Sequence, residues 1–310
     1  MILSITANTG IDRTIFIPEL LRGHTIRANR TVYSMAGKPC NASTVLAELG
    51  VPVTALGFAA GAIGQQMQTM LHKRGIQTDF TEVDGESRMN LVIIDESDSS
   101  NTTITPDTLQ VTPEHVANLK ARLAEKLRGA ACVIMGGSLP NSLSPEFYVD
   151  LLKQIKAADV PVIFDATGNN LKAGLQVSPD FIKPNEYELA SLIGEPVTSL
   201  EMAYEAGKNV LDTYGTIPII TLGKMDALAV LPHATYRIPA LDVPVVSAAG
   251  AGDSVVAGMA TAIHRGQSLE DGLKLGIAAA AATIMQAGTA ESDKADIERL
   301  QKQVELVPYP

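Results

Sequence analysis

Short apolar runs without polar alternation recur along the chain, separated by stretches with helical spacing. Strands that are apolar on both sides are buried on both sides, as in parallel sheets covered by helices. The order of these elements predicts an α/β fold with a parallel central sheet and helices on both faces. The segments that carry this prediction are 131–135, 145–157, 161–165, 181–185, 186–193, 202–214, 217–223 and 269–286.

Two stretches depart from this pattern. Residues 14–34 and 88–105 are rich in β-branched and polar side chains, alternate in places and lack helical spacing. We expect a small antiparallel sheet that projects from the main body as a lid over the ligand cleft. The alternative is a pair of edge strands of the main sheet. With the lid, formed by about 12–35 and 88–106, the chain is expected to be one domain, residues 1–310.

Charge and cysteine content limit the partners and the compartment. The formal net charge of −10 argues against a nucleic-acid partner, because nucleic acids are bound by basic surfaces. No run approaches the roughly 20 apolar residues that a membrane-spanning helix needs. The two cysteines, Cys40 and Cys132, form no disulfide framework and are typical of a reducing compartment. We therefore expect a cytoplasmic protein with small-molecule partners and no membrane contact.

Ligands of an open α/β sheet bind beyond the carboxyl ends of its strands. Polar residues and glycines directly after the apolar runs are therefore candidates for a site. Each one alone is typical of a turn or a cap, and their shared position along one edge favours a binding role. They are Asn8, Asp12, Gly137, Ser138, Asp165, Lys183, Asn185, Thr221, Gly223 and the turn at 250–253.

The turn at 250–253, Gly-Ala-Gly-Asp, is the strongest chemical signal. It lies between 243–246, which we expect to be a strand, and 254–260, a helix of small and apolar residues. Small residues at a helix start leave backbone N–H groups bare at the positive end of the helix dipole, and such groups bind anions. Asp253 fits a base that accepts a proton from an alcohol while the N–H groups hold a transferring phosphoryl group. The alternative is a capping aspartate in an ordinary glycine turn.

Several segments, in this order, resemble the ribokinase/PfkB family of carbohydrate kinases. The resemblance spans nearly the whole chain and is closest to the branch that contains 1-phosphofructokinase and tagatose-6-phosphate kinase. It implies a ribokinase-like three-layer sandwich with a mainly parallel central sheet and a small β-sheet lid. Segment 8–12 is similar to the family's sugar-binding N-terminal segment, 36–42 to its first signature and 250–254 to its second signature. Segment 183–188 is similar to the family's Lys-Pro-Asn-x-x-Glu motif. Segments 137–140 and 164–168 are similar to the branch of 1-phosphofructokinase and tagatose-6-phosphate kinase.

The resemblance implies ATP as the phosphoryl donor and Mg²⁺ as the metal ion. Asp253 would be the general base, and the backbone of Gly250, Ala251, Gly252 and Asp253 would form the anion hole. Phosphoryl transfer needs this combination of positioning, charge neutralisation and a proton acceptor.

The same resemblance implies the other residues on the donor side. Asn185 and Glu188 would hold Mg²⁺ through water, because this ion dehydrates reluctantly. The pair is also spaced as a capping box at a helix start, and both roles are compatible. Lys183 would lie near the phosphates, and Thr221 and Gly223 would lie along the nucleotide.

On the acceptor side, Asp12 and Asn41 would bind sugar hydroxyls. Lys38 and Arg88 are the expected phosphate contacts if the acceptor is a sugar phosphate, and Lys38 precedes a helix at 41–49 that favours an anion. The alternative for Arg88 is a solvated strand residue. The expected substrate-binding residues are Asp12, Gly37, Lys38, Asn41, Arg88 and Ser138.

The chain departs from the family pattern at several positions, so the acceptor stays open. A sugar phosphate of the fructose 1-phosphate or tagatose 6-phosphate type is expected. The alternatives are a kinase for a free sugar or nucleoside, and a catalytically weak sugar-phosphate sensor. We also expect a homodimer in which a second subunit covers the apolar face of the lid. The departures are Ala36, Pro39, Cys40, Thr103, Thr108, Leu109, Asp226, Ala248 and Ala249.

Overall fold

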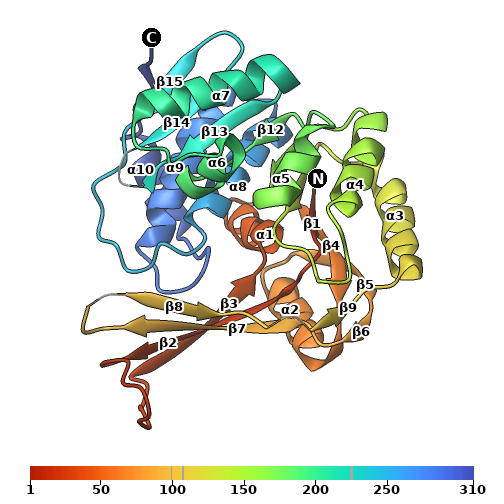
Figure 1. Cartoon of the computed structure of the whole chain (residues 1–310), viewed down its shortest axis with the longest axis vertical. Helices are drawn as coiled ribbons and strands as arrows, with labels where there is room; N and C mark the ends of the chain where they lie inside the picture. Colours follow the sequence, from red (N-terminus) through yellow and green to blue (C-terminus); the bar gives the residue numbers. More distant parts are fainter. Residues whose placement is uncertain (99, 107, 224–225) are drawn as a thin grey trace.

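A twisted, mostly parallel sheet forms the middle layer of the molecule (Figure 1). The structure is a computed structural model that describes residues 1–310 except 99, 107 and 224–225. In sheet order the strands are β16 (Val307–Pro308), β15 (Thr235–Ile238), β14 (Ala227–Val230), β13 (Ile217–Thr221), β12 (Phe181–Ile182), β11 (Val162–Asp165), β10 (Cys132–Gly136), β1 (Ile2–Thr6), β4 (Val53–Ala59) and β5 (Gln77–Glu82).

Neighbouring strands from β13 to β5 run parallel, and β14, β15 and β16 add an antiparallel edge. Adjacent side chains of β1 enter different cores, because Ile2 packs into the cluster on one face and Leu3 into the cluster on the other. This double burial is the reason that the strands read as unbroken apolar runs. The predicted parallel central sheet is confirmed.

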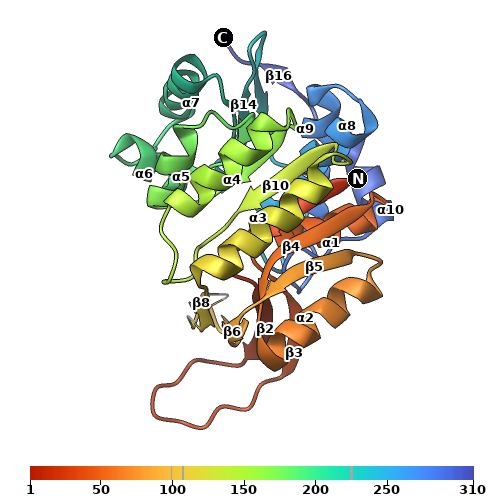
Figure 2. The same cartoon turned by 90° about the vertical axis from the view of Figure 1, so that its right-hand side faces the viewer.

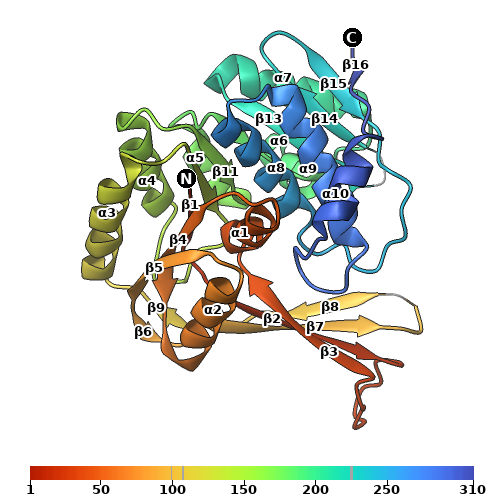
Figure 3. The ribbon, with the colours of Figure 1, turned by 180° about the vertical axis from the view of Figure 1, so that it is seen from behind.

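Helices cover both faces of the sheet, which completes the predicted three layers (Figures 1 and 3). None of the described helices combines the length and apolar character needed to cross a membrane. One face carries α1 (Lys38–Glu48), α2 (Gly61–Lys73), α8 (Ala251–Arg265), α9 (Leu269–Ile284) and α10 (Lys294–Gln301); the other carries α3 (Pro113–Leu127), α4 (Glu146–Ala157), α5 (Gly168–Leu175), α6 (Glu186–Ile193) and α7 (Leu200–Tyr214).

A separate sheet projects from the main body, as expected for the two unusual stretches (Figure 2). Its order is β3 (Arg30–Ala36), β2 (Gly10–Ile17), β7 (Arg88–Asp95) and β8 (Asn101–Ile104). The edge-strand alternative is wrong, because these strands do not pair with the central sheet. A short ribbon of β6 (Asp84–Gly85) and β9 (Leu109–Gln110) lies at its base.

The expectation of a purely antiparallel lid is also wrong. β2 pairs antiparallel with β3 but parallel with β7. Both strands leave the body near the carboxyl ends of central strands, since β2 follows β1, and β7 follows β5 after the two-residue strand β6. Two strands that leave the same edge in the same direction can only pair in parallel.

The segment at 243–246 is not a strand, which corrects the prediction from its β-branched residues. The amides of Val246 and Ser247 both donate to the carbonyl of Ile284 at the end of α9, at 2.7 and 3.2 Å. The side chain of Val245 is 67% exposed. The segment is therefore an extended connection held by the end of a helix. Its β-branched residues favour a strand only where a neighbouring strand can pair with them, and none does here among the described residues.

Candidate active site

The turn at 250–253 forms the start of α8, and its backbone requires glycine at the first position. Gly250 is the N-cap with φ 84°, in the left-handed region. A Cβ at this position would lie 2.3 Å from the amide nitrogen of Ala290. The amide of Ala251 donates a long 3.4 Å bond to the carbonyl of Ala248. The amides of Gly252 and Asp253 donate to no backbone carbonyl among the described residues, so they are available to an anion.

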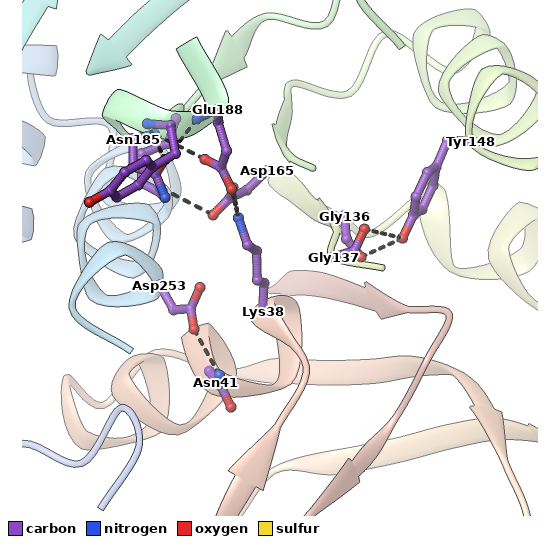
Figure 4. Close-up of polar contacts among 11 residues, drawn as sticks. Lys38, Asn41, Gly136, Gly137, Tyr148, Asp165, Asn185, Glu188 and Asp253 are labelled. Carbon is purple, nitrogen blue, oxygen red and sulfur yellow. Dashed lines mark hydrogen bonds and ion pairs between the residues drawn. The ribbon is translucent and has the colours of Figure 1, made fainter. Parts of the chain in front are cut away.

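Asp253 lies in the first turn of α8 and is almost fully buried. Asn41 Nδ2 donates a 2.8 Å hydrogen bond to its Oδ2 (Figure 4). Burial and the nearby charge of Asp165 raise the pKa of Asp253 to about 7, against the opposing effect of Lys38. A carboxyl with such a pKa exchanges a proton readily near neutrality, which a simple capping aspartate does not need.

Lys38 begins α1, after Gly37 with φ 99°. Its Nζ donates to Asp165 Oδ1 at 2.6 Å and to Glu188 Oε1 at 2.7 Å (Figure 4). Burial disfavours the charged ammonium, but the surrounding carboxylates outweigh it and raise the pKa of Lys38. The expected phosphate contact is thus also the partner of two carboxylates.

Asp165 lies between two lysines at the end of β11. Its side chain is 2% exposed, and that of Lys183 is 4% exposed, with Nζ 3.6 Å from Asp165 Oδ2. A Cβ at Gly252 would come within 3.0 Å of the Lys183 ammonium. Lys183 therefore places a positive charge directly beside the start of α8. The sequence showed Asp165 as one strand end among several and within a segment that resembles the branch, but gave it no role in the site.

Asn185 and Glu188 form the capping box expected at the start of α6. Asn185 Oδ1 accepts from the amide of Glu188 at 2.9 Å, and Glu188 Oε2 accepts from the amide of Asn185 at 2.9 Å. The other carboxylate oxygen of Glu188 faces Lys38 (Figure 4). Thr221 pairs with Asn185 through an isolated bridge, and Gly223, with φ 59°, lies beside the carboxylate of Glu186. The residues expected on the donor side are thus gathered at one end of the sheet.

A cavity of about 250 Å³ opens next to this group. The structure brings five of the six expected substrate-binding residues to its wall, although they come from distant parts of the chain. The Arg88 Nη1 and Asn8 Nδ2 atoms both lie within hydrogen-bond distance of Ser138 Oγ, at 3.2 and 3.3 Å. The cavity is lined by Thr6, Asn8, Gly37, Lys38, Asn41, Arg88, Gly137, Ser138 and Thr167.

Asp12, the sixth expected residue, lies on β2 and is 8% exposed. Its Oδ1 accepts from Asn90 Nδ2 at 2.7 Å, and its Oδ2 accepts from Thr289 Oγ1 at 2.8 Å. Burial raises the pKa of Asp12, while these two hydrogen bonds and Arg88 oppose the increase. Sequence reasoning missed Asn90 and Thr289. Asn90 could have been found because it lies two residues after Arg88, and alternate residues of a strand share one face. Thr289 carried no signal in the sequence.

Two of the departures from the family pattern have a structural explanation. Asp226, where a glycine is common, has φ 85°, and its carboxylate accepts from Arg237 Nε at 2.7 Å and from the amide of Ala240 at 3.0 Å. These contacts hold an aspartate in a conformation that favours glycine. Cys40 is fully buried in the core, which is typical of a cysteine that acts as a small apolar filler.

Comparison with known proteins decides the family. The model of the pfkB family carbohydrate kinases matches residues 3–296. The chain belongs to the pfkB family of carbohydrate kinases. This pfkB-family chain is 31% identical to a 1-phosphofructokinase of Borreliella burgdorferi over 99% of its length and 98% of that protein. It is 28% identical to a tagatose-6-phosphate kinase of Staphylococcus epidermidis, covering 99% of both chains. Its fold matches that of phosphofructokinase-2 from Escherichia coli with a TM-score of 0.90 at 23% identity, covering 97% of this chain and 98% of that one.

Replacing Asp253 by Asn should stabilise this pfkB-family protein more at pH 8 than at pH 5. The pKa of the buried carboxyl is raised from 3.8 to about 7, so the folded protein holds a proton that the unfolded chain releases. Stability is therefore lost as pH rises between these values, and Asn cannot ionise. The gain should grow by about 2–3 kcal/mol between the two pH values, from two pKa units of linkage. Urea unfolding measures it, and an equal gain at both pH values would contradict the assignment.

Proposed function

We propose that the protein is an ATP-dependent kinase that phosphorylates a hydroxyl of a sugar phosphate of the fructose 1-phosphate or tagatose 6-phosphate type. One observation carries the proposal. Asp253 lies at the start of α8, where an anion is favoured, and contacts Asn41 on the wall of the cavity. A base between an anion site and an acceptor cavity is what transfer of a phosphoryl group to an alcohol requires.

On the donor side, the backbone of the turn at 250–253, through the amides of Ala251, Gly252 and Asp253, would hold the transferring phosphoryl group. Three fixed features favour negative charge at this point: the bare amides, the helix dipole and the ammonium of Lys183 against Gly252. Because all three are held in place before reaction, they need little rearrangement as charge develops. Thr221 and Gly223 would lie along the nucleotide.

The acceptor hydroxyl would give its proton to Asp253 as its oxygen bonds to phosphorus and the bond to the leaving phosphate breaks. The hydrogen bond from Asn41 leaves one carboxylate oxygen of Asp253 without a hydrogen bond among the described residues. A pKa near 7 suits this task, because the group is largely ionised just above neutral pH and still basic.

The residues present fit Mg²⁺ held partly through water. Carboxylate oxygens are the ligands that this ion prefers, and Glu188 and Asp165 both present one toward Lys38. Among the described residues no cluster of three or more candidate ligands could hold a metal ion by itself, so we propose that Asn185 and Glu188 act through water. When bound, Mg²⁺ would neutralise phosphate charge.

The acceptor would occupy the cavity. Its hydroxyls would meet Asn41 on the wall and Asp12 on the lid strand β2, and its phosphate would meet Arg88, Lys38, Ser138 and the start of α1 after Gly37. The names of the two relatives, 1-phosphofructokinase and tagatose-6-phosphate kinase, support a phosphorylated sugar. The two free, buried cysteines support a cytoplasmic location.

The protein should release ADP from Mg²⁺-ATP with a sugar phosphate, and Asp253→Asn should abolish most of this activity. Removing the base while keeping the shape should lower kcat by roughly 10²–10⁴-fold with ATP affinity nearly intact. An ADP-release screen across sugars, nucleosides and sugar phosphates tests both points. Asp212→Asn, on the exposed face of α7, is the matched control and should be fully active. Turnover that survives Asp253→Asn would refute the mechanism, and binding without turnover in the wild type would indicate a sensor.

Arg88→Ala should raise the KM for a sugar phosphate by roughly tenfold or more, because a hydrogen bond to a charged group is lost. The KM for ATP should not change, and any slow turnover of the unphosphorylated sugar should be almost unaffected. Steady-state kinetics with both acceptors measures the difference. Arg128→Ala, an exposed residue at the end of α3, is the control. Equal losses for both acceptors would mean that Arg88 does not contact the phosphate.

We also propose a homodimer through the lid. Tyr33 and Ile104 on its strands are 43% and 56% exposed, and Leu20 and Leu21 in the β2–β3 connection are 44% exposed. Light scattering should report a dimer at micromolar concentration, and Ile104→Asp should shift it toward monomer. Val307→Asp removes an exposed apolar residue of β16 instead and should not affect assembly. A monomeric wild type would contradict this proposal.

A further inference from the structure

The carboxylate of Asp12 is held at both oxygens by groups from different parts of the fold. Asn90 of β7 donates to Oδ1 at 2.7 Å, and Thr289, in the loop after α9, donates to Oδ2 at 2.8 Å. A carboxylate only accepts hydrogen bonds, so the Thr289 hydroxyl must direct its proton at Asp12. Each oxygen keeps a further lone pair for another donor, such as a sugar hydroxyl.

Thr289 also binds the lid through its backbone. Its amide donates to Ser34 Oγ at 3.1 Å, and Ser34 is the residue of β3 that pairs with Asp12 of β2. The side chain and the main chain of Thr289 therefore hold neighbouring residues of two lid strands. Thr289 is only 5% exposed, so both bonds are protected from competing water. The loop after α9 lies next to the lid in two opposite views (Figures 1 and 3).

The next residue, Ala290, contacts the start of the turn at 250–253, called here the anion-hole turn after its proposed role. Its amide donates to the carbonyl of Ala249 at 3.1 Å, and its carbonyl accepts from Thr44 Oγ1 of α1 at 2.9 Å. Its atoms also fill the space that a Cβ on Gly250 would need. Ala290 has φ 51°, an uncommon conformation for a residue with a side chain, and these contacts hold it there. Two consecutive residues thus contact the lid and the anion-hole turn.

We propose that Thr289 is a positioning residue of the acceptor site. Its hydroxyl fixes the orientation of the Asp12 carboxylate, and its neighbour Ala290 fixes the distance of that carboxylate from the turn at 250–253. The inference rests on the proposed function, because it gives Asp12 the task of holding the acceptor. A charge-assisted bond from a buried hydroxyl selects one orientation of the carboxylate. Small misplacements of an acceptor cost much of the rate, so the bond contributes to both affinity and alignment.

Thr289→Val removes the hydroxyl and keeps the shape of the side chain, whereas Thr289→Ser keeps the hydroxyl. Thr289→Val should raise the KM for the sugar-phosphate acceptor roughly tenfold or more, as expected for a hydrogen bond to a charged group, with the KM for ATP unchanged. Thr289→Ser should restore most of the acceptor KM. Steady-state kinetics of ADP release with each substrate varied measures the split.

Thr216→Val is the matched control, since Thr216 is fully buried at the opposite end of the sheet and its hydroxyl has no hydrogen-bond partner among the described residues. It should leave both KM values unchanged. Should Thr289→Val fail to fold, Ser34→Ala loosens the same segment and should raise the acceptor KM in the same direction, by less. An unchanged acceptor KM in Thr289→Val, an equal rise in the KM for ATP, or failure of Thr289→Ser to restore the acceptor KM would overturn the proposal.

Calorimetric titration with fructose 1-phosphate and tagatose 6-phosphate separates this inference from the proposed function. If the wild type binds a sugar phosphate without turning it over, the proposed kinase activity fails. Weaker binding by Thr289→Val, restored in Thr289→Ser, still supports the positioning role in that case. Equal binding by the three proteins refutes that role whether or not the wild type is active.

Discussion

The site depends on the mutual compensation of buried charges around Asp165. Lys38 and Lys183 flank its carboxylate, Glu188 shares the ammonium of Lys38, and Asp253 lies within reach of the same charges. A buried charge is costly unless it is paired, and removing one partner leaves the others uncompensated. Each of these residues comes from a different element, namely α1, β11, the segment after β12, α6 and α8. The cluster therefore constrains how these elements meet.

The parallel sheet makes this meeting possible. Its parallel strands, β13 to β5 in sheet order, end at one edge. The starts of α6 after β12, of α1 after the lid strand β3, and of α8 after β15 come into contact beyond that edge. Lys38 from the first turn of α1 reaches Glu188 of α6, and Asn41 of α1 reaches Asp253 of α8. Helix starts carry partial positive charge, which favours phosphates and offsets the carboxylates. The lid contributes Asp12 and Arg88, which come from its strands, to the proposed acceptor side.

Much of the fold and most of the candidate site could be predicted because their signals are local. The apolar runs, the capping box of Asn185 and Glu188 and the glycine turn before Asp253 are each contained in a few consecutive residues. The failures share one cause. Whether 243–246 became a strand depended on a partner, which the end of α9 replaced. The parallel pairing of β2 with β7, and the bonds of Asn90 and Thr289 to Asp12, join residues far apart in the chain.

The sequence by itself determined which positions can adopt the required backbone conformation and which carry reactive side chains. Gly250 is needed because its φ is positive, and Asp253 lies three residues after it, in the first turn of the helix that begins there. Only the tertiary structure decided the state of those groups. The pKa of Asp253 is raised by burial and by Asp165, and the ammonium of Lys38 is held by two carboxylates from other elements. Backbone conformation depends mainly on neighbours along the chain, whereas burial and charge interactions depend on neighbours in space.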